Sequence, residues 1–213
     1  MENFADKISL YLPQYLSAAS KSALIDELKS FPIDGSKASF YTCALSQTDY
    51  LLQGDGVSGA FYVSLPDLSK TKTIEVLLLS NTCDMSLDNK RPYPSRIMYA
   101  PLINYDKYAK LISEHYPEKA ENHLKDIKAQ HVTQVMFLPK GEGLKHDSIV
   151  FFDQTISLPI SQQLVQRFCE NRLFTLSNFG LYLLLLKLSI HFTRIQERID
   201  RGTGIDLGQQ EIN

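Results

Sequence analysis

The stretch EVLLLSNTCDMSLDNKRPYPSRIMYAPLI, residues 75–103, is the segment on which the expected fold depends. Its aliphatic run, Val76–Leu79, predicts a buried strand that leads directly into the polar cluster SNTCD, Ser80–Asp84. A polar loop that carries Arg91 and Arg96 follows, and the chain returns in a second predicted strand. Because a buried strand holds the side chains at its end in fixed positions, the polar cluster is a candidate functional site.

The composition excludes several classes of protein. The chain has 213 residues, of which 44% are hydrophobic and 22% are charged, as in a globular domain. Its formal net charge is −2, so the chain lacks the excess of basic residues found in proteins that coat nucleic acid. A local basic patch is compatible with this net charge. Cys43, Cys83 and Cys169 are widely spaced and form no CxxC pair, so we expect no structural zinc site.

The expected location is the cytoplasm, where thiols stay reduced. The first residues, MENFADKISLYLPQYL, have no basic region before an apolar core, so we expect no signal peptide. The longest apolar run, Leu181–Leu186, is shorter than the ~20 residues that span a bilayer, so we expect no membrane partner. We also expect no metal and no cofactor.

Helices are predicted at both ends of the chain and in its middle. Apolar residues at three- and four-residue spacing predict an N-terminal helical lead over 1–35 and a C-terminal helix over 177–201. The polar, helix-prone segment 105–130 is interpreted as one or two surface helices inserted between strands. The last residues, 202–213, are expected to form a flexible tail.

From Phe40 onward, short β-rich runs alternate with turn formers such as Gly54-Asp55-Gly56. The predicted strands are Phe40–Leu45, Tyr50–Gln53, Ala60–Leu65, Ile74–Leu79, Ile97–Pro101, Val132–Leu138 and Ser148–Leu158. Many short strands with turn signals favour a small barrel, so the expected fold class is mostly β with added helices (α+β).

Four motifs follow one another in a recognisable order. Gly54-Asp55 opens a β segment, an aliphatic strand closes on Asn81, Ala100-Pro101-Leu102 ends the next strand, and Asp147-Ser148-Ile149 leads to Gln154. In this order the chain resembles the MazF/PemK family of toxin endoribonucleases. The resemblance implies an SH3-like, MazF/PemK-type barrel domain over 40–201, a homodimer, and RNA and an antitoxin-like protein as partners.

Two positions depart from that family's pattern. The family's catalytic Arg precedes the aliphatic strand, where this chain has Ile74 and Glu75. Its catalytic Thr or Ser follows the Ala-Pro-aliphatic step, where this chain has Ile103 and Asn104. The ribonuclease chemistry therefore does not carry over residue by residue.

The polar cluster and the loop after it offer a replacement set of catalytic groups. Metal-free RNA cleavage needs a base, an acid and a cation that stabilises the phosphorane charge. The candidates are Asp84 as base, Arg91 or Arg96 as cation, Ser80 or Asn81 as hydrogen-bond donor, and His131 near the same face. The alternative is that Asp84 caps a turn, Asn81 satisfies backbone groups and the arginines are solvated.

Cys83 carries a second hypothesis. A thiolate at a strand end is a candidate nucleophile or redox sensor. A negative charge on Asp84 close to the sulfur would disfavour the thiolate, but neighbouring residues on a strand point to opposite faces. The alternative is a buried cysteine that packs as a small hydrophobe.

The sequence therefore predicts a toxin-like protein of a bacterial toxin–antitoxin or phage-defence module, acting as a metal-independent endoribonuclease with a rearranged site. The alternative is a non-catalytic module on the same fold that binds RNA or a protein. The third hypothesis is a thiol-dependent enzyme or redox sensor at Cys83.

Overall fold

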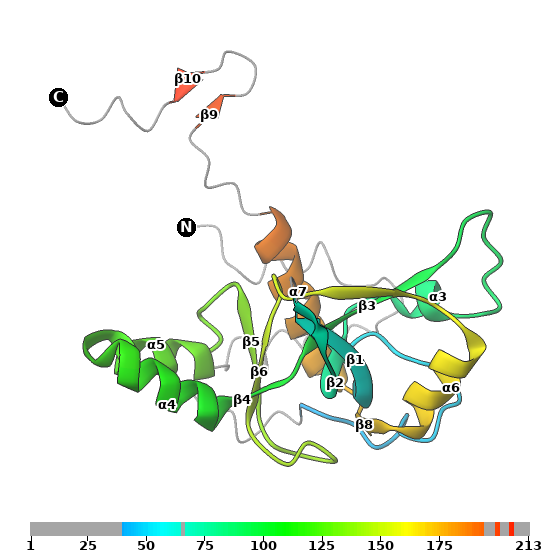
Figure 1. Cartoon of the computed structure of the whole chain (residues 1–213), viewed down its shortest axis with the longest axis horizontal. Coiled ribbons are helices and arrows are strands. Elements are labelled where there is room, and N and C mark those ends of the chain that lie inside the picture. The colour runs from blue at the N-terminus through cyan, green and yellow to red at the C-terminus, as the bar shows by residue number, and fades with distance from the viewer. Residues whose placement is uncertain (1–39, 65–66, 194–198, 201–204, 207–213) are drawn as a thin grey trace, which may run out of the picture.

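Antiparallel sheets and helices alternate along the chain in the computed structural model, which describes residues 40–64, 67–193, 199–200 and 205–206 (Figure 1). The protein is therefore of the α+β class, as the sequence predicts. The predicted helical lead over 1–35 lies outside the described residues.

The largest sheet has five strands in the order β7-β3-β2-β1-β8, and β4-β6-β5 form a second sheet. The strands are β1 Gly56–Ser64, β2 Asp67–Leu78, β3 Arg96–Pro101, β4 Ile103–Asn104, β5 Val135–Leu138, β6 Ser148–Phe151, β7 Ile156–Pro159 and β8 Arg172–Phe174. The two strands expected on either side of the polar cluster are confirmed. They are also neighbours in the sheet, because Leu77 of β2 lies opposite Ala100 of β3. Within the described ranges neither strand order closes on itself.

The end of strand β2, Val76–Leu78, is buried on both faces, which explains its continuous aliphatic run. Leu77 packs in one hydrophobic cluster with Met136 and Leu184, and Val76 and Leu78 pack on the other side. All three β2 side chains are 0% exposed. The strand therefore separates two cores and fixes the sheet between them.

Five helices lie in the described part of the chain: α3 Thr82–Met85, α4 Tyr105–His115, α5 Pro117–Lys128, α6 Gln162–Glu170 and α7 Asn178–Thr193. The pair α4 and α5 occupies one end of the molecule, and α3 and α6 lie at the other end (Figure 1). Asn104 caps α4 by accepting from the Lys107 amide at 3.0 Å, and Pro117 begins α5. No helix in the described ranges has the length and apolar character that a membrane crossing requires.

Several predicted boundaries are wrong. Residues 40–45 and 50–53 form turns and irregular backbone apart from a single bridge between Tyr41 and Leu176. The predicted strand over 148–158 is two strands, β6 and β7, that lie in different sheets. The sequence interpretation also missed α6, which Ser161 caps by accepting from the Leu164 amide at 3.2 Å.

The end of the chain also differs from the expectation. Helix α7 is described as far as Thr193, whereas Ile199–Asp200 (β9) pairs with Ile205–Asp206 (β10) in an antiparallel ladder. The prediction of a helix as far as Arg201 is therefore wrong at its end. The predicted tail over 202–213 contains β10, and its other residues lie outside the described ranges.

A buried ion pair lies where the first strand begins. Arg172 Nε is 3.0 Å from Asp55 Oδ2, and the two side chains are 3% and 0% exposed. The Leu52 amide also donates to Asp55 Oδ2 at 2.9 Å. Burial raises the pKa of the Asp55 carboxyl, and the Leu52 amide and Arg172 partly offset that rise.

The Arg172 guanidinium also holds the chain segment before β1. It donates to the carbonyl oxygens of Leu45, Ser46, Thr48 and Tyr50, and to the Thr48 hydroxyl at 2.8 Å. These contacts order residues 45–50 without a β ladder. The ordered segment lies between the two stretches, 40–45 and 50–53, that the sequence predicts as strands.

A buried lysine joins α7 to the turn after α5. Lys187 is 4% exposed, and its ammonium donates to the carbonyl oxygens of Gln130 and Val132, each at 2.8 Å. Burial lowers the pKa of Lys187 to about 8. The folded chain therefore releases this proton at a lower pH than the unfolded chain does.

We predict that Arg172→Met lowers the free energy of unfolding by about 3–5 kcal/mol, because it leaves a buried carboxylate and several carbonyl groups unpaired. Urea unfolding followed by circular dichroism measures this loss. The matched control is Arg96→Met, which removes an exposed guanidinium and is expected to cost about 1 kcal/mol or less. Equal losses for the two variants would contradict the structural role of Arg172.

We predict that Lys187 increases the free energy of unfolding as the pH rises from about 7.5 toward 10. In that range the unfolded chain keeps the lysine proton that the folded chain has released, so the free energy of unfolding increases by about 2 kcal/mol between about pH 7.5 and 9.5. Above pH 10 ionisation of tyrosines in the unfolded chain opposes the effect, because burial raises the pKa of Tyr99 to about 12. Urea unfolding of Lys187→Met should lack the rise, and an identical rise in that variant would refute the assignment.

Candidate functional site

The polar cluster Ser80–Asp84 is folded into a short helix and its cap. Asn81 begins α3 by accepting from the Cys83 amide at 2.9 Å, which is the backbone-capping role in the alternative interpretation. Ser80 Oγ accepts from the Met98 amide of β3 at 2.7 Å. Met85 is 2% exposed and anchors α3 in the hydrophobic cluster that contains Val76 and Leu78. Ser80 and Asn81 therefore position the backbone of α3.

The candidate base and one candidate cation bind each other. Asp84 and Arg91 form an ion pair in which the side chains are 46% and 22% exposed. The Asp84 carboxylate raises the pKa of the Arg91 guanidinium, chiefly through the hydrogen bond between them. Arg91 also donates to the Tyr93 hydroxyl at 3.3 Å. The ion pair with Asp84 therefore ties the middle of the loop between α3 and β3 to α3.

The other candidate catalytic groups lie elsewhere. Arg96 donates from Nε to Ser157 Oγ at 2.9 Å and from its terminal nitrogen to the Ser157 carbonyl at 2.7 Å, across β3 and β7. His131 follows α5, with Nδ1 at 3.4 Å from Asp126 Oδ1. Because α5 and α3 lie at opposite ends of the molecule in Figure 1, His131 does not join the cluster.

A cavity of about 390 Å³ lies beside α3 and includes Cys83. It is lined by Asp49, Tyr50, Leu51, Thr82, Cys83, Met85, Ser86, Leu87, Asp88 and Val165. The expectation that Cys83 is a buried packing residue is wrong, because the side chain is exposed. Its neighbour Asp84 turns to Arg91 instead of into this cavity.

A second hollow, about 450 Å³ in volume, lies between β1, the end of β7 and α6. We call it the Phe61 groove, and its lining is Phe61, Leu158, Pro159, Ile160, Ser161, Gln163, Leu164 and Arg167. The Phe61 ring is 50% exposed, and the Arg167 guanidinium lies over it at 4.8 Å from the centroid. Arg167 also donates to the Gly59 carbonyl, so its position is fixed from two sides.

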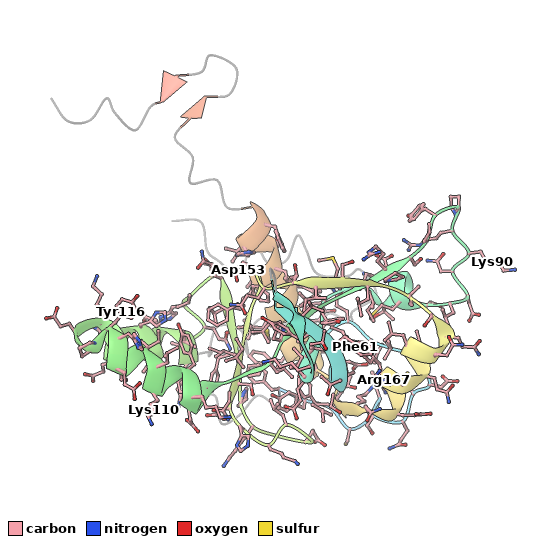
Figure 2. The ribbon with its side chains drawn as sticks, viewed as in Figure 1. Phe61, Lys90, Lys110, Tyr116, Asp153 and Arg167 are labelled. Carbon is pink, nitrogen blue, oxygen red and sulfur yellow. The ribbon has the colours of Figure 1, made fainter. Side chains whose placement is uncertain are left out.

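Helix α6 separates the two hollows. Val165 faces the cavity, whereas Leu164 and Arg167 face the Phe61 groove. Figure 2 shows Phe61 and Arg167 near α6, at the opposite end of the molecule from Tyr116 and Lys110 on the α4–α5 pair. The sequence interpretation missed this surface, because its signal is the pattern of Leu164, Val165 and Phe168 in a helix that the sequence reading did not predict.

The positions at which the resemblance to the MazF/PemK family implies catalytic groups are occupied by residues with structural contacts in this chain. Ile74 packs at the edge of the core that contains Val76, and Glu75 accepts the Leu102 amide through its carbonyl oxygen at 2.9 Å. The Asn104 side chain caps α4. None of these side chains supplies the cation or hydroxyl of that family's chemistry.

In the described ranges no three His, Cys, Asp or Glu side chains gather closely enough to hold a metal ion.

Comparison of the chain with models of known protein families and with curated proteins finds no match. The site must therefore be interpreted from its own geometry.

We predict that Asn81→Ala destabilises α3, because the Cys83 amide loses its acceptor. The expected loss is about 1 kcal/mol in the free energy of unfolding, and Asn81→Asp should retain most of the stability. Cys83 in the alanine variant should also react faster with iodoacetamide, measured by mass spectrometry. Unchanged stability and unchanged labelling would show that the cap is dispensable.

Proposed function

We propose that this chain is a non-catalytic, protein-binding module on a MazF/PemK-type, SH3-like barrel, serving a bacterial toxin–antitoxin or phage-defence module. The observation that carries the proposal is the surface on both sides of α6. There, large apolar side chains stay exposed beside two hollows, whereas the candidate base Asp84 and the candidate cations Arg91 and Arg96 are bound within the chain. Exposed apolar patches of this kind are typical of protein interfaces.

The connection between the two sheets supports the barrel assignment. Strand β3 ends at Pro101 and β4 begins at Ile103, so a single residue separates strands of different sheets. Strands that pass from one sheet to another at a bend form the corners of small barrels. The homodimer implied by the resemblance remains a prediction, which light scattering on the purified protein tests.

The charge of the surface favours a protein partner over RNA. Asp49 and Asp88 line the cavity. The cation Arg91 is paired with Asp84 of α3. RNA binding instead needs unpaired cations along a groove, with aromatic rings for the bases. In the Phe61 groove the guanidinium of Arg167 already covers the ring.

A metal-independent endoribonuclease is the second candidate, because one observation favours it. Asp84 of α3 contacts Arg91 in the loop that follows, and Arg91 contacts the exposed ring of Tyr93, as a base, a cation and a stacking surface would. The set has no positioned acid, since His131 lies at the other end of the molecule. The proposed binding module is therefore the better-supported function.

We predict that the purified protein does not cleave RNA. Single-stranded RNA incubated with the protein in EDTA should remain intact, as followed by denaturing gel electrophoresis. Cleavage that disappears in both Asp84→Asn and Arg91→Gln would establish the second candidate and overturn the proposed function. Asp153→Asn, a change at the turn after β6, serves as a control for the preparation.

We predict that a partner protein covers the Phe61 groove in the native host. A photo-crosslinking p-benzoylphenylalanine introduced at Phe61 should give one discrete protein adduct, identified by mass spectrometry. The same substitution at Tyr116 is the matched control, because this ring is 62% exposed but lies on the α4–α5 end. Equal adducts at both positions, or an RNA adduct at Phe61, would contradict a protein-binding face at α6.

A further inference from the structure

The cavity beside Cys83 has two walls, and hydrogen bonds hold both in place. Arg172 holds the Asp49–Leu51 wall through the carbonyl oxygens of Thr48 and Tyr50. Helix α3 forms the other wall, and the Gln53 amide ties the two together by donating to Thr82 Oγ1 at 3.1 Å. A hollow held in this way keeps its shape without a ligand, which is typical of binding sites.

The mouth of the cavity carries two carboxylates that lack a cation. Asp49 and Asp88 are both exposed and line the cavity, and neither forms an ion pair with the described part of the chain. Of the neighbouring cations, Arg172 pairs with Asp55 and Arg91 pairs with Asp84. Lys90, in the same loop as Asp88, is exposed and points outward from that loop (Figure 2). The mouth therefore carries two unpaired carboxylates.

The interior of the cavity is apolar. Leu51 and Met85 are 2% exposed, and Val165 of α6 completes this surface. Tyr50 and Leu87 stand at the rim, each 47% exposed. A ligand that fits must therefore present an apolar stem to the interior and a positive charge to the carboxylates.

We propose that this cavity binds a lysine or arginine side chain presented by the partner protein. Such a side chain combines an alkyl stem, which packs on apolar surface, with a cation at its end. A cavity of about 390 Å³ has room for it. The inference rests on the proposed function, since it names the chemistry by which the partner is recognised next to α6.

Cys83 is a reporter inside the cavity, and it allows the potential to be measured directly. Methanethiosulfonates transfer a thioalkyl group to a cysteine thiolate and release a sulfinate, so cationic and anionic reagents compare the local charge. We expect Cys83 to favour the trimethylammonium-ethyl reagent over the sulfonatoethyl reagent by at least about fivefold, relative to the exposed Cys43. The preference should disappear in the double variant Asp49→Asn, Asp88→Asn, and its persistence there would overturn the role of the carboxylates.

The occupant is tested by protection of Cys83 from iodoacetamide, read by mass spectrometry. Acetyl-Gly-Arg-Gly-amide at up to about 10 mM should slow the labelling of Cys83 at least twofold and leave Cys43 unchanged. The matched control peptide carries citrulline, which has the same shape without the charge. Protection by the arginine peptide alone, lost in the double variant, supports the proposal, and no protection or equal protection by citrulline overturns it.

Free agmatine, a decarboxylated arginine, separates the two sources of the cation. Protection by agmatine at a concentration at least tenfold lower than the peptide requires would assign the cavity to a small-molecule cation and overturn the protein side chain. The crosslink at Phe61 reports on the partner protein independently. A crosslink without peptide protection refutes the cavity inference alone, whereas protection without a crosslink refutes the proposed function.

Discussion

The ion pair between Asp55 and Arg172 is the constraint on which the rest of the structure depends. It lies at the point where Gly54, with a φ of 87°, turns the chain into β1. Arg172 begins β8, the strand next to β1, and its guanidinium continues past Asp55 to the carbonyl groups of residues 45–50. A buried carboxylate is tolerated only with such partners. The ion pair therefore holds the edge strand β8 and the loop of residues 45–50 in place together.

The same pair prepares the binding face that we propose. Residues 49–51 form one wall of the cavity, and they stand where Arg172 holds them. The opposite wall, α3, is held by the Asn81 cap and by Met85 in the core. Buried polar contacts therefore hold the walls of the cavity in place. The exposed carboxylates at its mouth are not needed for that stability.

The sequence predicts those elements whose stability is local. The aliphatic run Val76–Leu79 is visible because both faces of β2 are buried at its end. Helix α4 has Asn104 as its cap, and α5 begins at Pro117. The backbone of residues 40–53 could not be predicted, because Arg172 lies 124 residues from Thr48 and no sequence window contains both. Helix α6 was not predicted because it has only nine residues, too few for its apolar spacing to be distinguished from a strand and a turn.

The candidate site shows the same limit. Residue types suitable for catalysis were correctly placed at a strand end, but the partner of each side chain decides its role. Arg96 is bound by Ser157 across the sheet, Asp84 by Arg91, and Asn81 by the backbone of α3. A base that must accept a substrate proton and a cation that must meet a phosphate both need a free face. The carboxylates of Asp49 and Asp88 and the ring of Tyr50 keep a free face in this region, and such groups attract a cation rather than a phosphate.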